Sequence, residues 1–221
     1  MKPNHTDIYA RIHKGLRKAL FELSELAGKV NPGSTPEVDH LKKLGRRVFE
    51  FLELHAEIEE KFQLPLLEAQ NPEFVTTDHG EHQQLEGIIA DLKEALDQLS
   101  PNRSEEGDFY RYYLELNEFI GKYLLHMNHE ETVTAELFLK YCQNEDMQST
   151  IEAINGYTTP DQKFLALSYF MPAISQQERI VFLAGVKAKN HQAFQEMMKQ
   201  MQPLFSGEEC VDLVKELKAS L

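Results

Sequence analysis

The chain has 221 residues, of which 42% are apolar and 27% charged, an ordinary composition for a folded globular protein. Thirty-six acidic residues against 23 basic ones give a net charge of -13, which argues against nucleic acid or an anionic membrane as a partner because both would repel the chain. No apolar run approaches the ~20 residues of a membrane helix, and the N-terminus has no signal-peptide pattern. Two distant cysteines do not suggest a disulfide-built fold, so we expect a cytoplasmic protein.

Helical periodicity dominates the chain, and no hairpin signal or sustained strand-like alternation occurs in it. The pattern predicts four long helices, over residues 6–29, 36–68, 76–99 and 104–141. Pro65 is expected to kink the second helix or end it early. Long helices joined by short loops are typical of an all-α, up-down-up-down four-helix bundle.

Shorter helices are predicted after Cys142, over residues 147–154, 161–170, 175–189, 191–201 and 206–221. Ser175 with Glu178, and Ser206 with Glu209, have the spacing of a capping box at a helix start. We therefore expect a bundle domain over residues 1–145 and a C-terminal helical extension over residues 146–221, packed on the bundle. The sequence leaves the oligomeric state open.

Each predicted long helix carries one histidine on its apolar stripe, taken in steps of three or four residues. In the first and third helices the stripes are Tyr9, His13, Leu16, Leu20, Leu23 and His82, Leu85, Ile89, Leu92, Leu96, Leu99. In the second helix the stripe is Leu41, Leu44, Val48, Phe51 or Leu52, His55, Glu59, Phe62. In the fourth helix it is Tyr112, Leu116, Phe119, Tyr123, His126, Glu130, Val133, Leu137.

The four stripe histidines fall at about one height in the predicted bundle. Counted from the end that holds the first and third loops, His13, His55, His82 and His126 lie roughly 24, 28, 26 and 33 Å along their helices, at 1.5 Å per residue. This spread is within the error of the predicted helix ends. The imidazoles are therefore expected to meet in one layer of the interior.

Glu59 and Glu130 lie four residues after His55 and His126, so each shares a helix face with its histidine. A buried carboxylate is costly unless it is paired or binds a cation. A single inward histidine is more often an ordinary core residue, and the His-x-x-x-Glu spacing alone is common on solvated faces. Four histidines at one level with two glutamates favour two iron or manganese ions bridged by the carboxylates; a lone zinc ion would not need six ligands.

His79 precedes His82 by one turn and is open to three interpretations: a further metal ligand, a gate, or an exposed first-turn residue. Tyr9 and Tyr123 lie one turn from His13 and His126, where they would donate hydrogen bonds near the ligands or simply fill the core. The remaining histidines fall off the stripes and are expected on the surface: His5, His40, His129 and His191.

Four segments of this chain together resemble the hemerythrin-like (HHE cation-binding) family over residues ~5–140. They are RIHKGL around His13, HAEIEEKFQLPLLE from His55, EHQQLEGIIADL from Glu81, and HMNHEE from His126. The resemblance implies a non-haem di-iron centre, oxo- or hydroxo-bridged, with carboxylate bridges and an open position for a small diatomic ligand. Carried over by position, it implies this ligand set: His13, His55, Glu59, His82, His126 and Glu130.

The chain departs from the oxygen-carrying members of that family in two places. Those members have two histidines at i and i+4 in the third helix, whereas here Asp78 lies four residues before His82. They also have an Asp five residues after the fourth-helix histidine, whereas here Glu130 at i+4 faces inward better than Glu131 at i+5. These departures favour an open, exchangeable site over reversible oxygen storage.

Three functions are compatible with this pattern. The first is a protein that binds or senses O2, NO or a related oxidant at the di-iron site. The second is an enzyme-like role, such as peroxide or NO reduction or iron donation for repair, and the third is a metal-free helical interaction scaffold. Turnover with an electron donor would separate the first two. Loss of metal without loss of fold would favour the third.

Overall fold

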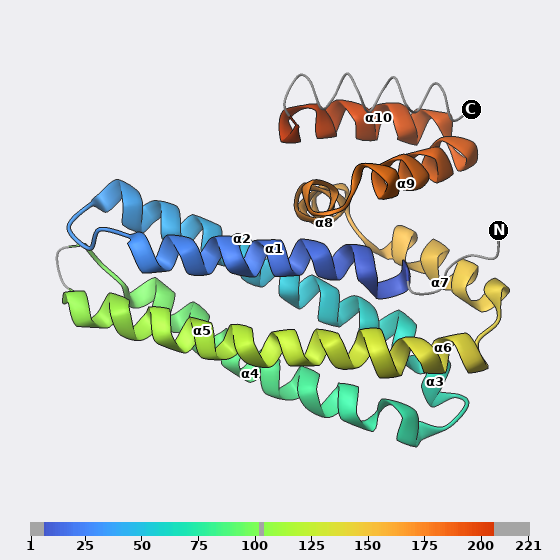
Figure 1. Ribbon diagram of the computed structural model, residues 1–221, viewed down its shortest axis with the longest axis horizontal. Helices are drawn as coiled ribbons and strands as arrows, with labels where there is room; N and C mark the ends of the chain where they lie inside the picture. Colours follow the sequence, from blue (N-terminus) through green and yellow to red (C-terminus); the bar gives the residue numbers. More distant parts are fainter. Residues whose placement is uncertain (1–6, 102–103, 206–221) are drawn as a thin grey trace.

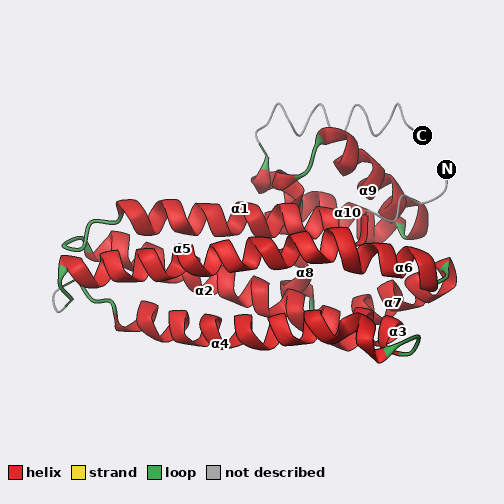
Figure 2. Ribbon diagram, turned by 60° about the horizontal axis from the view of Figure 1, so that its bottom comes forward, coloured by secondary structure: helices red, strands yellow, loops and turns green. Residues whose placement is uncertain are grey.

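The computed structural model describes residues 7–101 and 104–205, and within these ranges it is helical, with no strand. Four long rods lie side by side, and shorter helices cover one end of them (Figures 1 and 2). We call the rods the bundle. In chain order they are α1 (Asp7–Lys29), then α2 (Thr35–Ile58) continued by α3 (Leu64–Glu68), then α4 (Thr76–Gln98), and α5 (Glu106–His129) continued by α6 (Ala135–Tyr141).

Two of the rods are interrupted by π-helical turns, which the 3.6-residue periodicity did not predict. One turn, Glu59–Gln63, joins α2 to α3, and the other, Glu130–Thr134, joins α5 to α6. A π turn accommodates an extra residue and so rotates everything after it. Val133, predicted to point inward, is 45% exposed, and the next residue, Thr134, is buried instead.

The same shift affects the second rod. Phe62, the predicted inward residue, is only half-buried, and Leu64 and Leu67 are buried. The rod still ends at Glu68, as predicted, and Pro65 lies in the first turn of α3, directly after the π turn. A 3-10 turn, Pro72–Val75, then leads into α4.

The bundle interior has an apolar cluster on each side of a polar layer. α1 packs against α2 and α5, and α4 packs against the same two helices. The larger cluster is built from the predicted leucine stripes, including Leu16, Leu41, Leu96 and Leu116. A smaller one is formed by residues near the other end of the rods: Tyr9, Leu64, Leu67, Val75, Ala135 and Phe138. On the first three rods the stripe histidine lies between the two clusters in sequence, and on the fourth rod His126 lies at the edge of the larger cluster, between Tyr123 and Met127.

In the described chain after the bundle, four shorter helices follow: α7 (Asn144–Tyr157), α8 (Pro160–Ala173), α9 (Gln176–Lys189) and α10 (His191–Met201), and α10 leads into a 3-10 turn, Gln202–Leu204. We call α7–α10 the annex. α8 crosses α1 closely at Gly15, where an added Cβ would meet the backbone of Phe170 at 2.8 Å. The annex has its own small core: Leu167, Met171, Ile174, Ile180, Leu183 and Met201.

The capping box predicted at Ser175 is formed, with its hydroxyl accepting from the backbone N–H of Glu178. The one predicted at Ser206, and the helix predicted over 206–221, lie outside the described residues. The division of the chain at residues 145 and 146 stays a prediction. Within the described ranges, no helix is long and apolar enough to cross a bilayer.

Candidate metal centre

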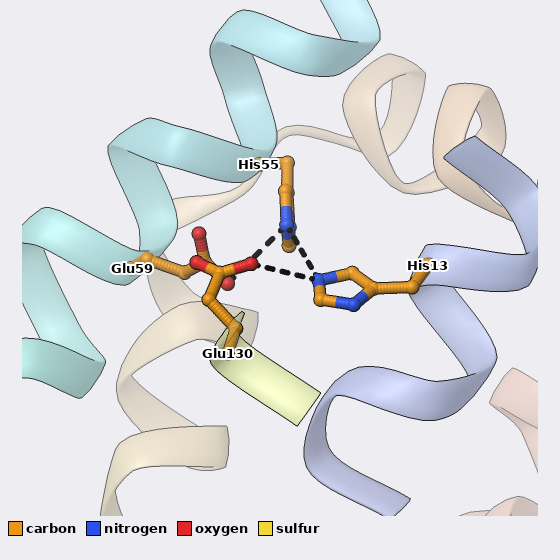
Figure 3. A group of neighbouring side chains, drawn as sticks. All are labelled: His13, His55, Glu59 and Glu130. Carbon is orange, nitrogen blue, oxygen red and sulfur yellow. Dashed lines mark hydrogen bonds and ion pairs between the residues drawn. The ribbon is translucent and has the colours of Figure 1, made fainter. Parts of the chain in front are cut away.

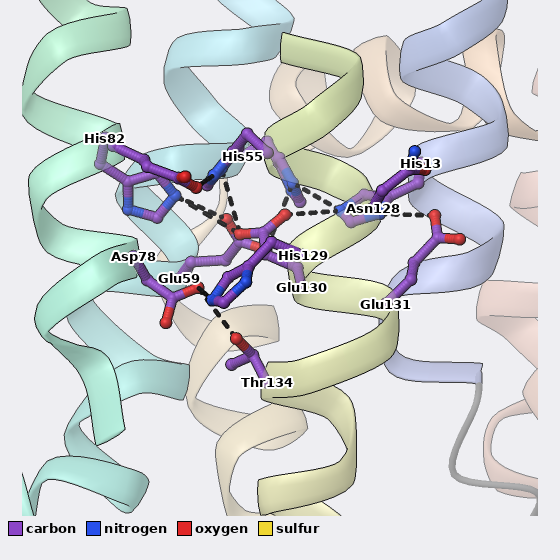
Figure 4. A network of polar contacts seen from close by, with 12 residues as sticks. His13, His55, Glu59, Asp78, His82, Asn128, His129, Glu130, Glu131 and Thr134 are labelled. Carbon is purple, nitrogen blue, oxygen red and sulfur yellow. Dashed lines mark hydrogen bonds and ion pairs between the residues drawn. The ribbon is translucent and has the colours of Figure 1, made fainter. Parts of the chain in front are cut away.

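The structure brings the four stripe histidines and the two glutamates together inside the bundle. Figures 3 and 4 show the following members of this layer: His13, His55, His82, Glu59 and Glu130. His13 comes from α1, His55 from α2, His82 from α4 and His126 from α5, and each is at most 5% exposed. The carboxylates of Glu59 and Glu130 are fully buried. Six polar side chains therefore occupy one layer of a largely apolar interior.

The backbone places each glutamate in the same way. Glu59 is the first residue of the π turn after α2, and Glu130 is the first residue of the π turn after α5. Each therefore follows its histidine by one ordinary helical turn, which keeps the two side chains on one face. The extra residue of the π turn comes after the carboxylate, and π turns of this kind are frequent at functional sites.

On the α1–α2 side, the Nε2 atoms of His13 and His55 face each other at 3.1 Å (Figure 3). The Nε2 of His13 lies 3.3 Å from Oε2 of Glu130, and that of His55 lies 3.2 Å from Oε1 of Glu59. Two nitrogens and two carboxylate oxygens thus converge from three rods.

On the α4–α5 side, His82 and His126 converge on the same two carboxylates, and Figure 4 shows His82 beside Glu59 and Glu130. The Nε2 of His82 lies 3.3 Å from Oε2 of Glu59 and 3.5 Å from Oε1 of Glu130. The Nε2 of His126 lies 3.2 Å from Oε1 of Glu130. Each glutamate therefore faces one group of histidines with one oxygen and the other group with its second oxygen.

The donor atoms fit metal cations. His13 and His55 with the two glutamates form one candidate group, His82 and His126 with the same glutamates form another, and the donor atoms of each group lie within 4.8 Å of one another. Within the described part of the chain, neither carboxylate accepts a hydrogen bond at either oxygen, and the Nε2 atoms of His82 and His126 have no hydrogen-bond partner. Buried polar atoms in this state are costly, and a cation would satisfy them.

The outer nitrogens of three histidines are held by carboxylates from neighbouring rods. The Nδ1 of His13 donates to Glu131 at 2.8 Å, and Glu131 also accepts from Arg17 at 2.6 Å. A metal-binding histidine commonly donates its second N–H to a carboxylate, which fixes the ring and raises its basicity. This contact therefore turns the Nε2 of His13 toward the interior.

Corresponding contacts orient the histidines of the α4–α5 side. The Nδ1 of His82 donates to Glu60 at 2.6 Å, and that of His126 donates to Glu81 at 2.8 Å. Sequence reasoning missed Glu60 and Glu81 and treated Glu131 as turned outward. A usable signal existed, because each of the three is the chain neighbour of a predicted ligand: Glu60 of Glu59, Glu81 of His82, and Glu131 of Glu130.

The two inward carboxylates have opposite pKa shifts. Burial, followed by the charge of Glu130, raises the pKa of Glu59 to about 8. Burial would also raise the pKa of Glu130, but its contacts with His126, His13 and His82 prevail and lower that pKa well below 4.5. Protons and metal cations compete for the same oxygens, so metal binding here releases protons.

The histidine pKa values depend on the carboxylates that face each ring. Burial alone would lower the pKa of His82, but the contacts with Glu130 and Glu59 raise it to about 11. The same opposition of burial and carboxylates gives His13 a pKa of about 9. For His55, burial and the neighbouring His13 charge lower the pKa well below 6.5. The layer as a whole is an environment that attracts positive charge.

The predicted tyrosines lie beside this layer. Tyr9 is 1% exposed, its ring centroid is 5.2 Å from that of His13, and its hydroxyl has no hydrogen-bond partner among the described residues. Tyr123 is 2% exposed, with its ring centroid 5.7 Å from that of His126. Burial, then the Glu59 charge, raises both phenol pKa values, so both phenols are neutral at physiological pH.

His79 lies outside both groups. Its side chain is 37% exposed, and its Nδ1 donates to Oε2 of Glu60 at 2.7 Å, on the same carboxylate that holds His82. His129, predicted on the surface, is instead half-buried, with its Nε2 4.0 Å from Asp78. Asp78 is fully buried and accepts from the Thr134 hydroxyl at 2.9 Å. The rotation after the π turn is what brings Thr134 to this position.

Long packed helices around a buried layer of imidazoles and shared carboxylates define a helical cation-binding protein. The model of the hemerythrin HHE cation-binding domain matches residues 4–138, and the chain belongs to that family. The family membership that the four sequence segments indicated is thereby confirmed over nearly the same range. Neither the curated proteins nor the solved structures gave a match.

Proposed function

We propose that the protein holds two non-haem iron ions in one bridged centre and binds or senses O2, NO or a related small oxidant there. The observation that carries the proposal is the sharing of Glu59 and Glu130 between two histidine pairs. One ion would be held by His13 and His55 and the other by His82 and His126. The bundle would have the up-down-up-down order of the hemerythrin fold.

The donor set supports iron. Imidazole and carboxylate ligands together suit iron, and six side chains are more than a structural zinc ion uses. Each ion would have two nitrogens and two shared carboxylates, fewer donors than octahedral coordination needs. When bound, such a centre supplies a redox-active metal with open positions for a diatomic ligand.

The surrounding residues would keep this centre dry and fixed. Tyr9 and the apolar cluster around Leu64 cover it on one side, and the leucine stripes cover it on the other. Glu60, Glu81 and Glu131 hold three of the rings in position through their Nδ1 atoms. Fixed rings reduce the motion that ligand binding would otherwise have to restrict.

The proposal also includes the binding partners of the protein and its location in the cell. A diatomic ligand needs no docking surface, and the net charge of -13 disfavours nucleic acid and anionic membranes as partners. A chain with two cysteines, of which Cys142 is free, suits a reducing cytoplasm. We therefore propose a cytoplasmic location.

Metal analysis after anaerobic iron loading tests the proposal. We expect about two irons per chain, near-ultraviolet absorption that the side chains do not supply, and a change in that spectrum on adding O2 or NO to the reduced protein. Glu130→Gln should lose iron, whereas Glu136→Gln, an exposed residue of the same rod, should retain it. A folded protein that takes up no iron, or a single zinc, would contradict the proposal.

A di-iron enzyme that reduces peroxide or NO, or donates iron for repair, is the second candidate. The observation in its favour is Asp78, a fully buried carboxylate whose Oδ2 has no hydrogen-bond partner in the described chain, at the position four residues before His82. Asp78 stands where the oxygen-carrying members of the family have a second third-helix histidine. The ion on the α4–α5 side would therefore have one nitrogen donor fewer than in those members. Turnover with an electron donor and peroxide or NO separates this candidate from a sensor.

A further inference from the structure

His55 lacks a contact that the other three buried histidines have. The Nδ1 atoms of His13, His82 and His126 donate to carboxylates at 2.8, 2.6 and 2.8 Å. His55 turns its Nε2 to the same interior, 3.2 Å from Glu59 (Figure 3), but no group within the described ranges forms a hydrogen bond with its Nδ1. Once Nε2 binds a metal, the proton is on Nδ1 and needs an acceptor.

The ring of His55 also lines a cavity of about 380 Å³ between α2 and the annex. This volume lies in the range of small-molecule sites, about 300–1,000 Å³. Most of the wall is aliphatic or aromatic, with Ile58 from the bundle and Ile154, Leu167 and Phe170 from the annex. Since Nε2 faces the bundle interior, we take Nδ1 to be the nitrogen on the cavity side.

The charge of the cavity wall differs from that of the rest of the molecule. The chain has 36 acidic residues, yet no Asp or Glu is among the described residues that line the cavity. The formally charged residue in this lining is Lys163, an exposed side chain whose Nζ donates to the backbone oxygen of Asn155 at 2.7 Å. A lysine and an unpaired imidazole N–H both favour a ligand that carries acceptor oxygens.

We propose that this cavity binds a monocarboxylate with an apolar body, of the fatty-acid class, whose carboxylate accepts a hydrogen bond from Nδ1 of His55. The apolar body contacts the annex side of the cavity. The ligand carboxylate takes the place at His55 that Glu131, Glu60 and Glu81 take at the other histidines. The inference rests on the proposed function, because metal at Nε2 is what fixes the proton on Nδ1.

The arrangement links the cavity to the metal centre. An acceptor on Nδ1 raises the basicity of the imidazole and so strengthens its bond to a metal. By thermodynamic linkage, metal at His55 then strengthens carboxylate binding by the same factor. The annex would in this way make the metal centre responsive to an organic acid.

Calorimetric titration of the full-length protein with octanoate tests the inference, in the iron-loaded and the metal-free form. We expect one octanoate per chain and at least about fivefold tighter binding to the iron-loaded form, the lower end of ordinary coupling between sites. 1-Octanol, which has the same body without the carboxylate, should bind at least about tenfold more weakly because it lacks the charged acceptor.

Two pairs of variants locate the site. Ile154→Trp fills the cavity and should abolish octanoate binding, whereas Ala153→Trp, an exposed neighbour in the same helix that does not line the cavity, should not. Lys163→Met should weaken binding about threefold or more through the lost attraction, and Lys189→Met should not. Iron content and the far-ultraviolet spectrum of each variant show that the centre and the fold persist.

Three results would overturn the inference: no octanoate binding to the iron-loaded protein, octanol binding as tight as octanoate, or equal octanoate affinity in both metal forms. Iron is measured in the same samples. A chain that holds two irons but not octanoate therefore refutes the inference alone, whereas a folded chain that holds no iron refutes the proposed function.

Discussion

Glu59 and Glu130 each begin a π-helical turn, and each extends a fully buried carboxylate between the same four histidines. Both belong to the same sequence pattern, His-x-x-x-Glu-Glu, which occurs from His55 and again from His126. In both copies the first glutamate points into the layer and the second holds a histidine of a neighbouring rod. The centre is thus built twice from one local pattern.

Glu60→Gln should weaken metal binding by about 10- to 100-fold, the usual effect of removing a carboxylate that orients a metal-binding histidine. Glu60 accepts from both His82 and His79 and is about one-third exposed, so its replacement by an isosteric amide should not disturb packing. Competition with a chelator, followed by metal analysis, measures the effect. Glu68→Gln, an exposed residue farther along the same rod, is the control, and equal affinities of the two variants would contradict the role of Glu60.

The buried layer of histidines and glutamates was predictable from the sequence because its signal is periodic. A histidine in each of four leucine stripes, such as His82 before Leu85 and Ile89, has to point where the leucines point. The inward glutamates were found for the same reason, since they follow His55 and His126 by one turn. Burial of all six residues shows that the stripes were assigned correctly up to Glu59 and Glu130.

Beyond those two glutamates the predicted inward positions are wrong, because the periodicity assumes 3.6 residues per turn. Each π turn adds a residue, so Val133 is 45% exposed and Thr134 is buried in its place. The carboxylates that bond the Nδ1 atoms were missed for a different reason. Glu60 and Glu131 are partly exposed, and their role depends on which rod lies next to them. Their place next to a predicted ligand in the chain was a usable signal, but a single sequence does not show which histidine each of them contacts.

Gly15→Ala should destabilise the contact between α1 and α8. A Cβ at Gly15 would lie 2.8 Å from the backbone of Phe170, which has no rotamer by which to move away. We expect a loss of about 1–3 kcal/mol in the free energy of unfolding, as for other overpacked sites. Gly121→Ala is the control: nothing lies within 4 Å of its added Cβ, and helix propensity should stabilise it by about 0.5–1 kcal/mol. Denaturant unfolding measures both, and a neutral or stabilising Gly15→Ala would contradict the close packing.

Protonation of the Glu178 carboxylate should make the annex less stable in acid. This carboxylate bonds Lys14 of α1 at 2.5 Å and accepts from Ser175 at the start of α9. The Lys14 contact, followed by those with Ser175, outweighs the effect of burial and lowers the pKa of Glu178 from 4.5 to about 2. Because the folded-state pKa is the lower one, this stabilisation is present above pH 4.5 and is lost as the pH falls from 4.5 toward 2.

The measurement compares the wild type with Glu178→Gln in metal-free protein, so that titration of the metal site is common to both. Their difference in free energy of unfolding should shrink as the pH is lowered through this window. Glu152→Gln, an exposed residue of α7, should show no such trend. A difference that stays constant from about pH 6 to about pH 3 would show that Glu178 contributes no ionic stabilisation.

The third-helix histidines provide the sharpest test of the ligand set. The Nε2 of His82 lies 3.3 Å from Glu59, and its side chain is 4% exposed, whereas His79 is 37% exposed and contacts Glu60 only through Nδ1. If the proposed two-iron centre is correct, His82→Ala should lose at least one iron, and His79→Ala should keep the wild-type iron content. His79→Ala is a matched control, since it removes an imidazole from the same helix and the same carboxylate.

Stability should separate the two variants as well. Without His82, Glu59 loses one of the imidazoles that face it and one cation that would compensate its buried charge, so the iron-loaded variant should melt at a lower temperature than the wild type. His79→Ala removes only a partly exposed contact, worth about 1 kcal/mol or less. If His79→Ala empties the site while His82→Ala keeps its iron, His79 rather than His82 is the ligand and the register of α4 is wrong. If both lose iron, His79 supplies a ligand and the oxygen-carrying interpretation of the third helix becomes the better one.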